Sequence, residues 1–199
     1  QIKRKQDEIK RLEAEGGDHS KVVKLQEDIA KLQQLKKTSE SDVGSLSGKY
    51  ESGGAKPGMV SSGVGDAGGV SYGSYQLASK TGTLDRYLNS SYGSKYKDEL
   101  SKAGPVNSEG YKAKWKEISE RDPAGFHKSQ HDFIKATHYT PALQKAQELG
   151  FDINNKGVQE AVFSGSVQHG KINQVLEMAA KDPAFKPGDP ESQINAFYN

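Results

Sequence analysis

The stretch "YESGG", residues 50–54, stands where a charged, helix-forming segment gives way to a glycine-dense one. Ten of the 30 residues from Gly44 to Gly73 are glycine, and few of the others are apolar. An ordinary connection does not need so much backbone freedom, so this segment is either a linker or a long loop shaped around a ligand. Glu51 lies within this segment, and its carboxylate is therefore a candidate functional group.

The sequence that follows the loop predicts helices. Apolar and aromatic side chains recur there at helical spacing, and proline and glycine residues mark the expected ends. The segments with these features are 74–90, 109–123, 123–139, 140–150 and 155–180. No alternating pattern of useful length predicts a strand. We therefore expect a mainly α-helical body, with a small irregular or β-like piece inside the glycine-rich loop.

The sequence before the loop predicts a helical hairpin. Residues 1–15 and 22–32 carry apolar side chains at helical spacing among many charged ones. The segment "EGGDHS", residues 15–20, can end the first helix with glycine and cap the second with Asp or Ser. We expect residues 1–37 to form a coiled-coil-like appendage that offers a surface to a helical partner, and residues 38–199 to form the catalytic domain.

The composition excludes several classes of protein. A net charge of +2 over 199 residues is too small to indicate a nucleic-acid partner. Because the chain has no cysteine, it has neither a disulfide nor a Cys-ligated zinc site. No apolar run approaches the roughly 18 residues of a membrane span. The chain begins at Gln1 instead of Met, so we expect it to be part of a longer protein.

Three short motif matches indicate other chemistries but lack the context that each one needs. "GVGDAG", residues 63–68, has dinucleotide-binding spacing without a predicted strand before it or a helix after it. "GVSYG", residues 69–73, has nucleophile-elbow spacing without a predicted parallel sheet. "HKSQH", residues 127–131, places two histidines one helical turn apart, and zinc would need a third ligand such as His138. We expect no metal site, and we expect these histidines to lie partly exposed on a core helix.

Two carboxylates in different surroundings suit the cleavage of a glycosidic bond. One acid protonates the leaving oxygen, and inverting enzymes add a second carboxylate that activates water. Glu51 lies at the end of a candidate helix, residues 41–52, where burial against apolar neighbours would keep it protonated near neutral pH. Asp66 lies 15 residues further along, in a loop where a solvated carboxylate could stay ionised. Glu51 is therefore the candidate general acid and Asp66 the candidate base, or Asp66 only stabilises its loop by accepting backbone N–H groups.

"YESGG", the glycine-rich loop and then "YGSYQLAS", residues 72–79, together resemble the lysozyme-like superfamily, and goose-type lysozymes and soluble lytic transglycosylases in particular. In that superfamily, a Glu-Ser pair that ends a helix is followed by a β-like region and a G-x-x-Q segment. The corresponding residues in this chain are Glu51-Ser52 and "GSYQ", residues 73–76. "VFSGSVQHG", residues 162–170, is similar to a segment of phage-type and injected peptidoglycan hydrolases.

The resemblance covers residues 44–198 and implies a lysozyme-like helical fold with peptidoglycan glycan strands as the partner. The implied activity is that of a muramidase, which cleaves the β-1,4 bond between N-acetylmuramic acid and N-acetylglucosamine without a cofactor. Its implied place of action is the periplasm or cell wall of a bacterium, after delivery by a phage particle or a secretion system. The residues that would line the cleft and bind sugar groups are Ser74, Tyr75, Gln76, Tyr139, Gln168 and His169.

Other functions remain open at this point. A lytic transglycosylase would use Glu51 as both acid and base and would not need Asp66. A wall-binding or structural module of a phage tail or secretion machine would keep the fold without cleaving anything. Chitosanase-like relatives share the fold and also use a Glu and Asp pair, so chitosan-type polymers are an alternative substrate.

Overall fold

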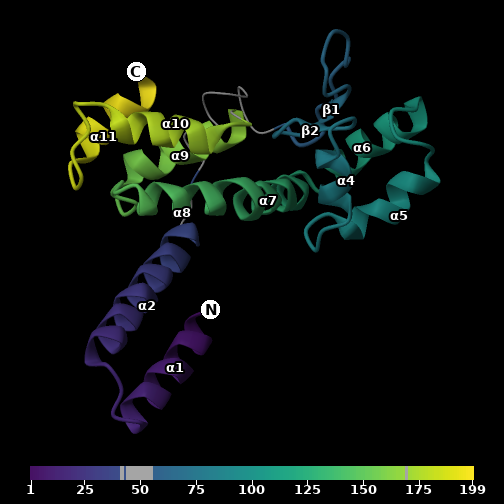
Figure 1. Cartoon of the computed structure of the whole chain (residues 1–199). Coiled ribbons are helices and arrows are strands. Elements are labelled where there is room, and N and C mark those ends of the chain that lie inside the picture. The colour runs from purple at the N-terminus through teal and green to yellow at the C-terminus, as the bar shows by residue number, and fades with distance from the viewer. Residues whose placement is uncertain (41–42, 44–55, 169) are drawn as a thin grey trace. The chain divides into compact units, whose positions relative to one another are not determined.

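The computed structural model describes residues 1–40, 43, 56–168 and 170–199 (Figure 1). Two of the expected site residues, Glu51 and His169, lie outside the described residues. The chain is mainly helical and carries one very small sheet, which confirms the expected fold class. No helix in the described part of the chain is both long and apolar enough to cross a membrane.

The chain divides into two compact units. The first unit comprises Gln1–Asp42, Leu143–Ala161 and Asn173–Asn199, and the second comprises Val43–Ala142 and Val162–Ile172. The first unit thus contains the N-terminal helices together with segments from the C-terminal part of the chain. The division into an appendage of residues 1–37 and a catalytic domain of residues 38–199 stays a prediction.

The first unit begins with the expected helical hairpin, formed by α1 (Ile2–Ala14) and α2 (His19–Ser39) (Figure 1). Asp18 caps α2, because its carboxylate accepts the backbone N–H of Ser20 at 2.9 Å. Lys5 Nζ and Asp28 Oδ2 lie 2.6 Å apart and join the two helices. The unit ends with α11 (Pro190–Tyr198) and includes most of α10 (Ile172–Lys181).

The second unit contains most of the functional candidates. Its helices are α4 (Thr83–Leu88), α5 (Ser94–Lys102), α6 (Glu109–Arg121) and α7 (Pro123–Ile134), and α7 continues into a π-helix (Lys135–Tyr139). Trp115 is fully buried and packs against Tyr72 and Phe126, with ring centroids 5.1 and 4.7 Å apart. Such aromatic pairs contribute about 0.5–1.5 kcal/mol beyond their buried area. The core of this unit therefore joins α6 and α7 to the chain that leads out of the glycine-rich loop.

Two further helices, α8 (Thr140–Glu148) and α9 (Lys156–Gln168), contribute residues to both units. Pro141 suits the first turn of α8 because its missing N–H would have no partner there. Gly150 follows α8 with a φ of +89°, a conformation that glycine adopts without strain. These are the start and stop that the sequence predicts for this segment.

The small sheet consists of β1 (Ser71–Tyr72) and β2 (Leu77–Ala78), which pair antiparallel with Tyr72 opposite Leu77. Val60 forms an additional antiparallel bridge to Tyr72. The bridge makes the glycine-rich segment a hairpin-like loop whose two sides meet near residues 60 and 72. This confirms the expected β-like piece within the glycine-rich loop.

The expectation of a helix over residues 74–90 is wrong in its first half. Residues 73–76 form the turn between β1 and β2, and α4 begins only at Thr83. Gln76 has a φ of +49° and Gly82 a φ of +80°, and neither value belongs to a right-handed helix. The apolar residues of this stretch suit helix and strand alike, and the strand pairing decides between them.

Candidate functional site

The turn of residues 73–76 lies against helix α7. The backbone N–H of Ser74 donates to Oε1 of Gln130 at 3.0 Å. The Ser74 hydroxyl lies 3.1 Å from Nδ1 of His127, and the Tyr75 hydroxyl lies 2.7 Å from Nδ1 of His131. Two residues expected to line the cleft therefore contact the "HKSQH" segment directly.

Gln130 joins the two ends of the glycine-rich loop. Its side chain is fully buried, and its Nε2 donates to the carbonyl oxygen of Pro57 at 3.1 Å while its Oε1 accepts from Ser74. Trp115 Nε1 donates to the same Pro57 oxygen at 2.8 Å. Pro57 stands six residues after Glu51 in the sequence. A single buried amide thus fixes both the entry and the exit of the loop that carries Asp66.

Gly73 is required where the turn meets Gln130. Its φ is +77°, and a Cβ added there would lie 2.2 Å from Gln130 Oε1. We expect Gly73→Ala to lower the free energy of unfolding by about 2–5 kcal/mol, since it combines left-handed strain with loss of a buried hydrogen bond. Chemical denaturation measures this change.

Gly65→Ala is the matched control for Gly73→Ala, because Gly65 has the same φ of +77° and a Cβ there would meet no atom within 4 Å. It should cost only the backbone strain, about 1–2 kcal/mol. Equal losses for the two variants would contradict the role given to the contact with Gln130.

The aromatic surroundings of Tyr75 extend to α9. The Tyr75 ring is stacked on His127, with centroids 5.8 Å apart and an interplanar angle of 23°, and His131 lies 5.4 Å from Phe163. Tyr139 packs edge-on against Phe163 at 5.6 Å and is fully buried. In this conformation Tyr139 has no surface with which to contact a polymer, so it acts here as a packing residue.

Burial lowers the pKa of His127 from its ordinary value of 6.5. Between the folded and unfolded pKa values, the folded state therefore binds fewer protons than the unfolded chain, and the free energy of unfolding falls as the pH is lowered below about 6.5. Burial and, to a lesser degree, Arg86 lower the pKa of His138 and act in the same direction.

We expect His127→Asn to lose less stability than the wild type between about pH 7.5 and pH 5, because asparagine does not titrate there. Its amide can replace Nδ1 in the hydrogen bond with the Ser74 hydroxyl. Denaturant unfolding at the two pH values measures the difference. An unchanged pH dependence would show that His127 is not the titrating group.

Asp66 lies exposed in the loop between residues 61 and 70. Its Oδ1 accepts the N–H of Gly68 at 2.8 Å, and its carbonyl oxygen accepts the N–H of Gly69 at 2.9 Å. Asp66 therefore stabilises a tight turn, which is one of its two expected roles. The other carboxylate oxygen, Oδ2, points to no hydrogen-bond donor among the residues that the structure describes, and the role of Asp66 as base stays a prediction.

The remaining expected site residues are not brought together by the described structure. The Gln76 side chain is exposed at the tip of the turn, and Gln168 is exposed at the end of α9. Glu51 and His169 lie outside the described ranges, so their expected roles stay predictions. No group of three histidine, aspartate or glutamate side chains in the described ranges is arranged to hold a metal ion.

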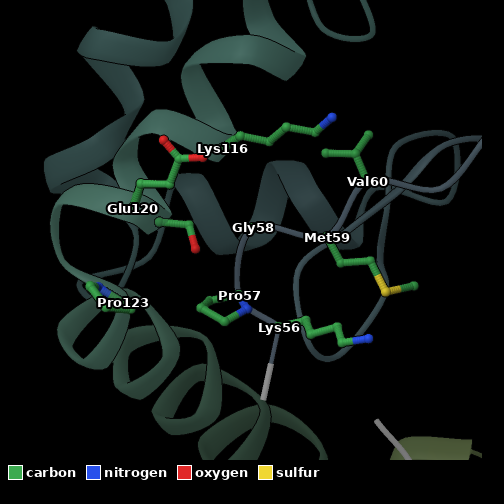
Figure 2. Close-up of a pocket in the computed structure, with 9 residues that line it drawn as sticks. Lys56, Pro57, Gly58, Met59, Val60, Lys116, Glu120 and Pro123 are labelled. Atoms are coloured by element: carbon green, nitrogen blue, oxygen red, sulfur yellow. The ribbon is translucent and has the colours of Figure 1, made fainter. Parts of the chain in front are cut away.

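A pocket that sequence reasoning missed lies beside the entry of the loop (Figure 2). It has a volume of about 590 Å³ and is lined by residues 56–60 together with Lys116, Ser119, Glu120 and Pro123. Gly58 brings the loop close to α6, since a Cβ at Gly58 would lie 2.8 Å from Ser119. The spacing of Lys116 and Glu120 is that of any solvent-exposed helix face, and it gives no signal of a pocket.

Comparison with known proteins identifies relatives of the whole second unit. Residues 43–190 match the family described as type VI secretion system spike protein VgrG3-like, C-terminal. The chain is 40% identical over 130 residues to the type VI secretion system spike protein VgrG3 of Vibrio cholerae serotype O1. That alignment covers 64% of this chain but only 12% of the length of the relative. The resemblance to goose-type lysozymes and soluble lytic transglycosylases is therefore wrong as a family assignment, because the matching family is one of secretion spike proteins.

Proposed function

Because the chain belongs to the VgrG3-like C-terminal family of type VI secretion system spike proteins, we propose that it is a wall-cleaving domain carried by such a spike. In this proposal the domain is a muramidase that hydrolyses the β-1,4 bond between N-acetylmuramic acid and N-acetylglucosamine. A secretion system delivers it, and it acts on peptidoglycan in the periplasm or cell wall of a bacterium.

The observation that carries the proposal is the fixed loop between Pro57 and Ser74. Gln130 holds both ends of this loop through buried hydrogen bonds. The loop carries Asp66, and Glu51 precedes it by six residues in the sequence. A rigid helical body that fixes a loop between two carboxylates supports acid and base catalysis, because catalytic groups must be held in position to act.

The proposed reaction is a single displacement at the anomeric carbon of N-acetylmuramic acid. Glu51 donates its proton to the glycosidic oxygen as the bond from the anomeric carbon to that oxygen breaks. Asp66 takes a proton from a water molecule whose oxygen forms the new bond to the same carbon. An inverting reaction of this kind requires about 6.5–9.5 Å between the two carboxyl groups. The chemistry needs no cofactor.

Residues of the turn are the proposed contacts to the glycan. Gln76 is exposed and can both donate and accept hydrogen bonds through its amide. Tyr75 is half-buried, and its hydroxyl is already bonded to His131, which fixes the direction of its ring. Ser74 is held in the same way by His127. Gln168 and His169 are further proposed contacts at the end of α9.

The proposal is tested by following the release of soluble fragments from purified peptidoglycan. The wild-type domain should clear a suspension of peptidoglycan, and heat-unfolded protein should not. A folded domain that binds the suspension but never clears it would instead be a wall-binding module of the secretion machine.

A further inference from the structure

The pocket beside Pro57 contains charged side chains that form no ion pair within the described residues. They are Lys56, Lys116 and Glu120. The other basic residues of α6 are all paired with carboxylates: Lys112 with Glu109, Lys114 with Glu117 and Arg121 with Glu99. The lysine of α6 that faces the pocket is thus the one whose charge is left for a ligand.

The backbone of the pocket is held rigidly. The carbonyl oxygen of Pro57 accepts hydrogen bonds from Trp115 and Gln130, both of which are fully buried. Gly58 lies so close to Ser119 that a Cβ would have no room. A ligand would therefore meet a wall that is already formed, and ordering this backbone would add little to the cost of binding.

The charges are separated across the pocket. In Figure 2 the ammonium groups of Lys56 and Lys116 lie toward the same side of the view as Met59, and the carboxylate of Glu120 lies toward the opposite side. Pro57, Val60 and Pro123 add apolar surface to the walls. This arrangement suits an extended ligand with carboxylates at one end, apolar atoms in its middle and an amine at the other end.

We propose that this pocket binds the stem peptide of peptidoglycan, an inference that rests on the proposed function. The stem peptide is a short chain with free carboxylates, small apolar side chains and, where it is not cross-linked, a free side-chain amine. Its carboxylates contact Lys56 and Lys116, and its amine contacts Glu120. A neutral sugar has no group for these charges, and a polyanion such as a nucleic acid would be repelled by Glu120.

Titration with a free stem peptide tests the pocket without any requirement for catalysis. Lys56→Gln combined with Lys116→Gln should weaken binding of the peptide by about 2- to 30-fold, the range expected for two exposed charge pairs. Lys102→Gln removes the same charge from the exposed end of α5 and should leave affinity unchanged. Glu120→Gln should weaken binding of the peptide with a free amine and not of the same peptide after acetylation of that amine. Equal affinity of the wild type and the double variant, or no binding to either, would overturn the proposal.

A second measurement separates failure of the pocket from failure of the proposed function. The wild type should have a lower KM for peptide-bearing peptidoglycan than for glycan strands stripped of their peptides, and the double variant should lose that preference. Equal KM values for the two substrates in the wild type would overturn the pocket proposal and leave the hydrolase intact. If neither substrate is cleaved, the hydrolase is contradicted, and the peptide titration still decides whether the pocket binds its ligand.

Discussion

Replacement of Glu51 by glutamine is expected to lower the rate of glycan hydrolysis by about 100- to 10,000-fold, the usual contribution of general acid catalysis. Glutamine has nearly the same shape as glutamate but cannot give a proton to the leaving oxygen. The rate is measured as the release of reducing sugar from solubilised glycan strands. The free energy of unfolding should stay close to that of the wild type.

Glu40→Gln is the matched control, because Glu40 is an exposed glutamate that lies eleven residues earlier in the sequence. It should retain the wild-type rate. If a folded Glu51→Gln protein turns over nearly as fast as the wild type, Glu51 is not the general acid.

Asp66→Asn is expected to lower hydrolysis by a similar factor, about 100- to 10,000-fold, because the amide cannot take a proton from water. The structure makes this substitution a sharp test. Asparagine keeps an oxygen that can accept the N–H of Gly68, which Asp66 accepts now at 2.8 Å. The turn should therefore survive, and stability should be nearly unchanged.

Asp66→Ala removes both the turn hydrogen bond and the carboxylate. It should lose activity as Asp66→Asn does and should also lose about 0.5–1.5 kcal/mol of stability. Full activity in Asp66→Asn together with reduced stability in Asp66→Ala would limit Asp66 to its role in the turn. Comparing the two variants thus separates the two roles that the sequence leaves open.

The helices could largely be predicted from the sequence because their signals are local. Asp18 caps α2 and Gly150 follows α8 as their positions indicate. Residues 74–82 could not be predicted in the same way, because their conformation depends on pairing between β1 and β2 and on contact with α7. Gln130 meets Pro57 and Ser74 across 73 and 56 residues of sequence, and no local pattern records such contacts.

The candidate site could be predicted only in part for the same reason. Ser74 and Tyr75 stand where the lysozyme-like pattern usually has an aliphatic pair, and the structure supplies a physical reason, since their hydroxyls bond His127 and His131. Tyr139 could not be distinguished from a cleft residue by sequence, because a tyrosine suits both a core and a sugar-binding surface.

The pocket beside Pro57 gave no signal in the sequence at all. Its walls come from the end of the glycine-rich segment and from one face of α6, which lie nearly 60 residues apart. Lys116 and Glu120 have the spacing of an ordinary exposed ion pair, but the structure shows no such pair between them. Only the fold reveals that these charges face a hollow surface.

Mass spectrometry of the fragments released from purified peptidoglycan in isotopically labelled water tests the central claim most directly. Hydrolysis predicts fragments that end in a reducing N-acetylmuramic acid and carry one oxygen atom from the labelled water, and Glu51→Gln should release almost none. Fragments that end in a 1,6-anhydro sugar without labelled oxygen would contradict hydrolysis and the role of Asp66 as base.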